Sequence, residues 1–589
     1  MEHTTGQKNW NNTPEPIFIQ ILQQLQVNDV IACSEVCIDW NVFCEDQLLW
    51  KHLFQRDYGN KFHKKYKEEA VLKPGATRWK DEYIRLRDHV PSIATQTLEG
   101  HTDEVLHVAF SHDGKELISC SRDKRIIVWS LDDGKDKFVS TFSKDMSTYG
   151  WVYPAQAQYS PNDTKFMVLG KTEEEGFAEL DLAIFSRNVT CDMLCRLKDG
   201  NGLHPILQNY VSNIDYPQEP FVHYLSNVIT PNGYWYSDDS FLFATEEQND
   251  STNNMNTSIW THPIPCLNNE TTSDSSEKND HEKPLITFKS DYSEGWASFT
   301  LCTRRKDNTI NNSNNNNEVS IQENKQNIES KEDESSFYNN IEQDISSTNL
   351  PGKFPLDNCP LDKIPLDNSQ NELYPTKDKE LLAVTLSLNR ISVPNLPHGK
   401  LVHQISFNRI LSNDTTELKT EEKIPVNVLE VDGVVIGATI DTKHEFLYLN
   451  IRNFDKSNDN VNTPRRRYGQ EVHEEIQIRR IDLQTLEFEP GVMIIGHKGF
   501  TRKIFNGIFR LDIDLSENYI SSGSEDSNGY IWDKHYKFLV AKLPHTKCVS
   551  CVAFNPIDEE TCVSASDDNT LKVWRSSRKQ REVHLSSKK

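Results

Sequence analysis

Three short stretches of the chain repeat one pattern, and this pattern decides the fold. Residues 117–129 read LISCSRDKRIIVW, residues 519–532 read YISSGSEDSNGYIW, and residues 562–574 read CVSASDDNTLKVW. In each stretch a serine stands four residues before an aspartate, and a tryptophan follows six residues after it. A histidine precedes the three tryptophans by 28, 35 and 29 residues. The sets are His101, Ser119, Asp123 and Trp129; His497, Ser522, Asp526 and Trp532; and His545, Ser564, Asp568 and Trp574.

The constant spacing predicts a chain of hydrogen bonds across one unit of β structure. An aspartate in a tight turn can accept hydrogen bonds from backbone N–H groups and from the histidine. The serine hydroxyl on the preceding strand then bridges the histidine and the indole N–H, which needs a partner when buried. A catalytic Ser-His-Asp triad is the alternative, but a triad is needed once and at an open cleft. We therefore interpret the three sets as structural tetrads and expect no catalytic residue.

Strands of alternating polarity surround the tetrads. The alternation begins near residue 93, returns strongly at 497–575, and is weaker at 150–265 and 380–490. Gly-His followed by strand, turn and strand ending in Trp resembles the WD40 repeat, in which about 40–45 residues form one blade of a β-propeller. Counting the weaker segments as blades held by apolar packing predicts seven blades over residues 93–576 and leaves eight open.

The ring of blades needs a strand that joins its two ends. Residues 93–98 (IATQTL) form a short strand pattern just before the first Gly-His. This strand can become the outer strand of the last blade and pair with its otherwise unpaired edge strand. The competing strand is residues 582–585 near the C-terminus, and we favour the N-terminal one.

Two polar tracts interrupt the β pattern. Residues 247–284 and 304–376 are rich in Asn, Ser, Asp, Glu and Lys. Such tracts bury too little apolar surface to offset the entropy cost of ordering them, so we expect disordered insertions within the propeller. The hydrophobic share of 36% over 589 residues agrees with this. The 64 Lys and Arg against 88 Asp and Glu give a formal charge of −24, which argues against a general nucleic-acid-binding protein.

The N-terminal residues 12–58 have a helical rather than a strand period. Ile17, Ile21 and Leu25 fall at i, i+4 and i+8, as in a short amphipathic helix. Residues 13–54 resemble an F-box, with Thr13 where that family usually has Leu. The resemblance implies that this module binds a Skp-type adaptor through a set of mostly apolar residues. These are Pro14, Ile21, Leu22, Leu25, Val30, Val36, Cys37, Trp40 and Trp50. The alternative is a plain helical cap on the propeller.

A charged segment, residues 59–92, joins the two parts. Trp79, Tyr83 and Leu86 lie on one face of a predicted linker helix, and Pro91 should end it. The fold class we expect is therefore α+β and multidomain: an all-α F-box and linker helix, then an all-β WD40 propeller. Residues 577–589 follow as a basic tail.

This order of modules resembles the F-box proteins that carry WD40 repeats. The resemblance implies a non-catalytic substrate receptor of an SCF-type cullin–RING ubiquitin ligase, with protein targets bound by the propeller and, in relatives, linked to centrosome duplication. It also implies a second assembly through a damage-binding-type adaptor and cullin-4. Those adaptors favour Trp-Asp-x-Arg at a blade end, whereas this chain has His535 in place of the Arg of that motif, after Trp532 and Asp533. A WD40 scaffold that does not promote degradation is the alternative function.

No other motif points to chemistry. Cys548 and Cys551 form a CxxC, but residues i and i+3 of a strand point to opposite faces, so we expect no metal and no cofactor. The chain shows no secretory signal or membrane span, and its 12 cysteines are too few for a disulfide scaffold. We expect a cytoplasmic protein with a nuclear pool, because residues 465–467 and the tail are basic. A solvated loop and tail is the plainer interpretation of those charges, and an import signal is the alternative.

Overall fold

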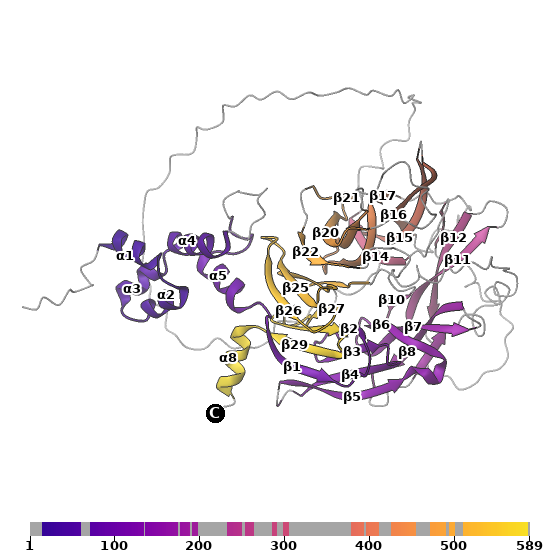
Figure 1. Cartoon of the computed structure of the whole chain (residues 1–589), viewed down its shortest axis with the longest axis horizontal. Coiled ribbons are helices and arrows are strands. Elements are labelled where there is room, and N and C mark those ends of the chain that lie inside the picture. Colours follow the sequence, from indigo (N-terminus) through magenta and orange to yellow (C-terminus); the bar gives the residue numbers. More distant parts are fainter. Residues whose placement is uncertain are drawn as a thin grey trace, which may run out of the picture. The chain divides into compact units, whose positions relative to one another are not determined.

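The computed structural model describes most of the helical module and the strands. The described residues are 14–59, 71–132, 134, 136–174, 177–188, 191, 193–197, 233–249, 254–263, 286–290, 298–305, 379–393, 396–410, 426–454, 472–490, 494–500 and 510–586. The chain starts with helices and continues as a β-propeller (Figure 1). Within these residues no helix is long and apolar enough to cross a membrane.

Four short helices form the N-terminal module, and a fifth follows it. They are α1 (Glu15–Leu22), α2 (Val27–Ser34), α3 (Ile38–Cys44), α4 (Gln47–Tyr58) and α5 (Trp79–Asp88). Helix α4 begins at an N-cap aspartate, Asp46, whose carboxylate accepts the Leu49 N–H at 2.7 Å. The predicted linker helix over 59–92 is thus shorter than expected, since α5 starts at Trp79. Residues 60–70 of that prediction lie outside the described part of the chain.

Six sheets consist of consecutive antiparallel strands. Their bounds are β2 (Val105–Phe110), β3 (Glu116–Ser121), β4 (Arg125–Asp132), β5 (Lys137–Asp145); β6 (Trp151–Tyr159), β7 (Lys165–Glu174), β8 (Phe177–Ser186), β9 (Met193–Leu197); β10 (Gly233–Ser237), β11 (Ser240–Asn249), β12 (Asn254–Pro263), β13 (Ile286–Ser290); β14 (Ser298–Arg305), β15 (Lys379–Val393), β16 (Leu396–Ile410), β17 (Asn427–Val431); β18 (Gly433–Ile440), β19 (Phe446–Asn453), β20 (Glu475–Asp482), β21 (Glu487–Phe488), β22 (Ile494–Lys498); and β23 (Ile513–Leu515), β24 (Tyr519–Ser522), β25 (Asn528–Asp533), β26 (Leu539–Pro544).

A further sheet joins the two ends of the β region. Strand β1 (Ile93–Glu99) pairs with β29 (Thr570–Arg575), which continues into β28 (Thr561–Ser566) and β27 (Val549–Phe554). The register places Leu98 opposite Leu571. The predicted closing strand is confirmed. The competing strand at 582–585 is wrong, because that segment belongs to helix α8 (Ser577–Ser586).

Two predicted boundaries need correction. The tract 247–284 contains the end of β11 and all of β12, because Thr, Ile and Trp in that stretch pair along the neighbouring strand. The tract 304–376 begins two residues too early, because β14 extends to Arg305. Between the two tracts, ITFK (residues 286–289) forms β13 and completes the sheet of β10. The rest of the first tract, and residues 306–376 of the second, lie outside the described residues.

The core lies between neighbouring sheets. One cluster joins the closing sheet to the next one through buried side chains such as Val108, Trp129 and Val563. A second joins that sheet to the following one through Ile118, Trp151 and similar residues. Every residue of β27 and β28 is buried, so both faces of these strands are covered.

Candidate functional site

Three of the nine predicted adaptor-binding residues are buried in the helical module. Leu22 and Val30 have 0% exposed surface and Trp50 has 1%. The Trp50 indole N–H donates to the Cys44 carbonyl oxygen at 2.7 Å, which fixes α4 against the end of α3. In this structure these three side chains support the module from inside, and direct contact with an adaptor stays a prediction for them. The helical spacing of apolar residues could not show which of them are buried inside the module and which lie on its surface.

The module instead presents another apolar set to solvent. Ile17 and Ile21 lie four residues apart on α1, so they share one face. Ile38 and Val42 do the same on α3. Six of the twelve large exposed hydrophobic side chains of the described chain lie in this module: Ile17, Ile21, Val36, Ile38, Val42 and Leu48. Such a concentration is typical of a protein interaction surface.

The remaining predicted residues divide by exposure. Pro14 is exposed, while Leu25, Cys37 and Trp40 are half-buried. Trp40 packs on Phe18, with ring centroids 4.7 Å apart, so only part of its ring can reach a partner. Ile17, Ile38, Val42 and Leu48 are absent from the predicted set. The i, i+4 spacing of Ile38 and Val42, on either side of the half-buried Trp40, was the sequence feature that could have placed them on one exposed face.

The helical module shares a core with the propeller. Tyr536 and Phe538, in the turn after β25, belong to the same buried cluster as helices α1 to α5. The rings of Phe54 and Tyr536 lie 5.0 Å apart, and those of Tyr58 and Phe538 lie 5.6 Å apart and stacked. Burial of several aromatic rings stabilises such a junction, since each ring removes a large apolar area from water.

A buried ion cluster fixes the linker helix to the same turn. The Arg85 guanidinium lies 2.5 Å from the Asp533 carboxylate and 2.6 Å from that of Glu82. The exposed fractions of the Arg85, Asp533 and Glu82 side chains are 11%, 1% and 3%. Burial opposes the charge on Arg85, but the hydrogen bonds that Arg85 donates to Glu82 and the negative charge of Asp533 outweigh burial and raise the pKa of Arg85. Asp533 also accepts the N–H groups of His535 and Tyr536, so it holds both the turn and the helix.

The same turn was expected to bind a damage-binding-type adaptor. His535 donates from Nε2 to the carbonyl oxygen of Val71, at 3.2 Å. Tyr536 next to it is 7% exposed. The linker of the chain therefore contacts this blade end, while Lys534 and His535 stay partly exposed.

Two of the three tetrads form as predicted. The His101 ring lies 2.8 Å from both Asp123 and Ser119, and Trp129 donates to the Ser119 hydroxyl at 3.0 Å. The corresponding distances for His545 are 2.9 Å to Asp568 and 2.7 Å to Ser564, and Trp574 donates to Ser564 at 2.7 Å. Both serines have no exposed surface, so they cannot meet a substrate.

The third tetrad does not form, which corrects the prediction. Among the described residues, neither ring nitrogen of His497 has a hydrogen-bond partner, and neither has the Trp532 indole N–H, although both rings are buried. The Ser522 hydroxyl instead accepts from Asn450 of the neighbouring sheet at 2.8 Å. Asp526 accepts from the Tyr530 hydroxyl at 2.5 Å.

Two features of the sequence explain the difference. His497 lies 35 residues before its tryptophan, at least six more than in the other sets. It stands in β22, which pairs with β20 of the preceding sheet. Position 530 is a tyrosine here, whereas the equivalent residues Ile127 and Lys572 have no hydroxyl to compete for the aspartate. The longer spacing of His497 and the tyrosine at position 530 are therefore the two sequence features that indicate an incomplete third tetrad.

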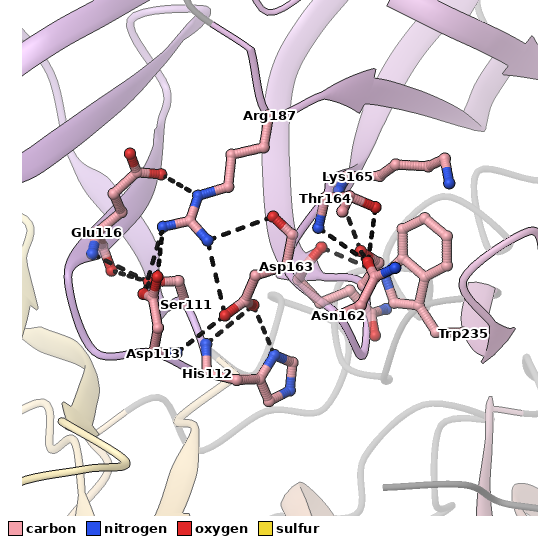
Figure 2. A network of polar contacts seen from close by, with 12 residues as sticks. Ser111, His112, Asp113, Glu116, Asn162, Asp163, Thr164, Lys165, Arg187 and Trp235 are labelled. Carbon is pink, nitrogen blue, oxygen red and sulfur yellow. Dashed lines mark hydrogen bonds and ion pairs between the residues drawn. The ribbon is translucent and has the colours of Figure 1, made fainter. Parts of the chain in front are cut away.

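Polar contacts between turns tie neighbouring blades together. Figure 2 shows the carboxylate of Asp163, after β6, accepting the backbone N–H groups of His112 and Asp113 at 2.9 Å each. Arg187 bridges the same turns, with 2.6 Å to Glu116 and 3.0 Å to Asp113. Burial alone would raise the pKa of Asp163, but the hydrogen bonds from His112 lower it below its usual value. The pair of turns is thus held by ionised groups.

Similar contacts recur at other turns on the same edge. Each joins the turn between the first two strands of one sheet to that of its neighbour. The pairs are Asp238 with the Asn162 N–H, Asn555 with the Gly114 carbonyl, and Glu559 with the Asn518 N–H. Because strands in a sheet alternate in direction, these turns and the Asp533 turn lie at one end of the blades, and the tetrad aspartates lie at the other.

The predicted basic tail is a paired helix rather than a solvated tail. Arg578 in α8 contacts both carboxylate oxygens of the buried Glu560, at 2.5 to 3.2 Å. Lys579 pairs with Asp558, and Arg581 lies 3.4 Å from Asp88 at the end of α5. Helix α8 thus links the closing sheet to the linker helix. Residues 465–467 lie outside the described part of the chain.

Comparison with known proteins supports both modules. A family model described as "F-box-like" matches residues 10–56, and one described as "WD domain, G-beta repeat" matches residues 93–130 and 538–575. Both WD segments carry a closed tetrad. The chain is 26% identical to F-box/WD repeat-containing protein 5 of Mus musculus over 96% of this chain and 94% of that protein. It is 25% identical to the Homo sapiens protein of that name, over 96% and 95%. It is also 26% identical to F-box/WD repeat-containing protein 7 of Drosophila melanogaster, but over only 21% of this chain and 10% of that protein.

Proposed function

We propose that the chain is the substrate-recognition subunit of an SCF-type cullin–RING ubiquitin ligase, in which the F-box-like module binds a Skp-type adaptor and the propeller binds the target protein. The observation that carries this proposal is the concentration of exposed apolar side chains on a helical module that is itself anchored to the propeller. A plain helical cap would turn its apolar side chains toward the sheets. Here Ile38 is 83% exposed and Leu48 is 73% exposed.

The adaptor-binding surface in this proposal differs from the one that the family motif implies. Its centre is the Ile38 and Val42 face of α3, together with Ile17 and Ile21 of α1. Leu22, Val30 and Trp50 hold these helices in place from inside. Burial of a few aliphatic side chains of this size at the centre of an interface contributes about 1.5–3 kcal/mol each.

The target-binding surface belongs to the other end of the blades. The helices dock at the turn around Asp533, so that end of the propeller is occupied. The turns with Asp123 and Asp568 lie at the opposite end. A target bound there is presented at a fixed offset from the adaptor, because the aromatic contacts and Arg85 prevent free rotation. A ligase works by raising the effective concentration of a target lysine near the conjugating enzyme, so the chain needs no catalytic residue.

The blade number follows from how the closing sheet is counted. Six sheets consist of consecutive strands, and β1 completes a sheet with β27 to β29. We count this sheet as a blade, which makes seven. The pairing of Leu98 with Leu571 supports that count, because it gives the last blade its outer strand.

Two further assignments are secondary proposals. Assembly with cullin-4 through a damage-binding-type adaptor would require a surface at the Asp533 turn beside the linker, where Lys534 and His535 are partly exposed. A cytoplasmic protein with a nuclear pool, acting in centrosome duplication, is proposed on the resemblance alone. The scaffold function is the second candidate, and it predicts unchanged target half-lives after depletion of the protein.

Affinity purification of the full chain tests the ligase proposal. The variant Ile38→Asp with Val42→Asp places two charges on the α3 face, and we expect loss of the adaptor while propeller-bound proteins remain. Val139→Asp with Val428→Asp is the matched control, because these valines are 45% and 39% exposed on the outer strands β5 and β17. Proteasome blockade keeps short-lived targets in the sample. Equal adaptor recovery from both double variants would refute the proposed surface.

A further inference from the structure

Three side chains that commonly bind metal ions meet at the inner strands of the propeller. His107 lies on β2, Cys551 lies on β27, and Asp512 directly precedes β23. One donor atom of each residue lies within 4.8 Å of the others. Among the described residues, no other group of His, Cys, Asp and Glu meets this condition. His107 and Cys551 are buried, with 8% and 3% exposed surface, so the group is not an ordinary cluster of surface acids.

The convergence follows from the repeat itself. His107 is paired with the residue after the tetrad serine of its blade, Cys120. Cys551 is paired in the same way with Ala565, and the Asp512 carbonyl accepts the N–H of Gly523. The three residues therefore occupy one equivalent position in three consecutive blades. Inner strands of neighbouring blades lie side by side, so equivalent positions come together near the axis of the ring.

The distances fit a metal site better than a direct hydrogen bond. The His107 Nε2 and Asp512 Oδ2 atoms are 3.6 Å apart, which is longer than a hydrogen bond. Zinc bonds of about 2.0 Å to N and O place two tetrahedral ligands about 3.3 Å apart, and a bond of about 2.3 Å to S places a sulfur about 3.5 Å from an N or O ligand. The His107–Asp512 pair is thus about 0.3 Å wider than two zinc ligands. The Cys551 Sγ, which contacts the Val108 carbonyl oxygen at 3.5 Å, lies within 4.8 Å of the other two donor atoms and must move inward by at most about 1.3 Å to complete the set.

The chemistry of the three groups also fits. His107 is buried and turns Nε2 toward Asp512, and an imidazole nitrogen is the commonest metal ligand in proteins. Arg510 donates to Asp512 Oδ1 at 2.5 Å, which leaves Oδ2 facing His107. A ligand carboxylate held by such an outer partner is common in metal sites. Burial raises the pKa of the Cys551 thiol, so an ion must displace its proton on binding.

One existing contact must be given up. His107 Nδ1 accepts the Ala157 N–H at 3.4 Å, a long and weak hydrogen bond. Metal binding at Nε2 moves the imidazole proton to Nδ1, so the two N–H groups would then face each other and separate. The Ala157 amide is therefore a direct reporter of occupancy.

We propose that His107, Asp512 and Cys551 form a binding site for one divalent transition-metal ion of the zinc type, which ties three consecutive blades together beside the closing sheet. The mixture of imidazole, thiolate and carboxylate ligands selects zinc-like ions over magnesium or calcium, which prefer oxygen ligands. Water supplies the fourth ligand. The proposal does not depend on the ligase function.

Sequence patterns could not reveal this site. Metal motifs are recognised by ligands at short, fixed spacing, and here more than 400 residues separate His107 from the other two ligands. The sequence analysis considered Cys551 only with Cys548. The ring closure by β1 and β29 brings the distant ligands together.

Cobalt titration of the chelator-treated full-length chain tests the proposal. We expect one Co²⁺ per chain, with a thiolate-to-cobalt charge-transfer band and the intense visible bands of tetrahedral cobalt. Cys551→Ser should abolish the charge-transfer band, and His107→Gln should weaken Co²⁺ binding at least tenfold. Cys548→Ser is the control, since it removes a thiol three residues away on the same segment. Near-ultraviolet circular dichroism of each variant shows whether the propeller is folded.

A second measurement does not depend on the variants. Zn²⁺ should raise the melting temperature of the wild-type chain, and a chelator should reverse the rise, because an ion that binds only the folded state stabilises it. The Ala157 amide resonance should shift at the same Zn²⁺ concentration. Absence of the charge-transfer band in the wild type, its persistence in Cys551→Ser, or its loss in Cys548→Ser would each overturn the proposal.

Discussion

Arg85 in helix α5 and Asp533 at the end of strand β25 form an ion pair of 2.5 Å, although 448 residues separate them in the chain. The pair is buried, and Glu82 completes it on the helix side. This buried ion pair therefore connects the linker helix directly to the propeller. Several measurable consequences come from this pair and from the tetrads.

Arg85→Ala should loosen the junction between the helical module and the propeller. The change leaves the carboxylates of Asp533 and Glu82 buried without their cation, and breaking such a pair costs about 3–5 kcal/mol. Hydrogen exchange should show faster exchange in α5 and in the turn after β25, and limited proteolysis should cut the linker. Arg122→Ala is the control, because the Arg122–Glu104 pair is 43% and 29% exposed and should contribute about 0–1 kcal/mol. Equal effects of both variants would contradict this role of Arg85.

The open and closed tetrads should respond differently to the same substitution. Trp574→Phe removes the indole N–H that Ser564 accepts, whereas Trp532→Phe removes an N–H that has no partner in the described part of the chain. Both variants lose similar ring volume, so their difference isolates the hydrogen bond. We expect Trp574→Phe to destabilise the chain by about 1 kcal/mol more in chemical denaturation. A larger loss for Trp532→Phe would show that the third tetrad closes in solution.

The stability of the propeller should fall as the pH falls below neutrality. Burial lowers the pKa of His403 to about 4, while an unfolded histidine titrates near about 6.5. Below about pH 6.5 the unfolded chain takes up a proton that the folded chain excludes, so stability is present above that pH and is lost progressively down to about pH 4. The full shift corresponds to about 3 kcal/mol.

His403→Asn isolates this contribution. His403 Nδ1 accepts the Val435 N–H at 2.8 Å, and the asparagine oxygen can accept the same N–H. The variant should lose less stability between pH 6.5 and 4 than the wild type, measured as the shift of the denaturation midpoint at each pH. Parallel curves for the two proteins would mean that His403 becomes charged without unfolding.

Helix α8 should protect the end of the linker helix from exchange. Arg578→Ala with Lys579→Ala leaves Glu560 without its guanidinium partner and Asp558 without its ammonium partner. Because Arg578 is 45% exposed, we expect a loss of only about 1 kcal/mol, seen as faster hydrogen exchange at the end of α5 and in the turn before β28. Lys115→Ala, on an exposed turn, is the control. No change in α5 would mean that α8 stabilises only its own sheet.

In the helical module, the family motif predicted the positions of the helices but not which of their apolar residues are exposed. The family pattern correctly located the helices, but it grouped Leu22, Val30 and Trp50 with the exposed Ile21 and Val36. A helical period shows which residues share a face. It does not show whether that face meets a neighbouring helix or solvent, because both surfaces of such small helices are apolar here.

The third tetrad shows the same limit within one repeat. The order of His497, Ser522, Asp526 and Trp532 matches the other sets. However, Asn450 from the preceding sheet donates a hydrogen bond to the Ser522 hydroxyl. A competing group from another blade has no fixed spacing to the motif. The local pattern therefore predicted the tetrads of His101 and His545, where the described residues place no such competitor at the serine.

The order of amino acids alone was sufficient for the repeat, the two closed tetrads, the helical module and the strand that closes the ring. These features rest on hydrogen bonds and apolar periods within a few tens of residues, or on one strand that lacks a partner. Folding in three dimensions decided which apolar residues stay exposed, how Arg85 reaches Asp533, and that His107, Asp512 and Cys551 meet. Those contacts join residues hundreds of positions apart, and only the closed ring of sheets fixes the distances between them.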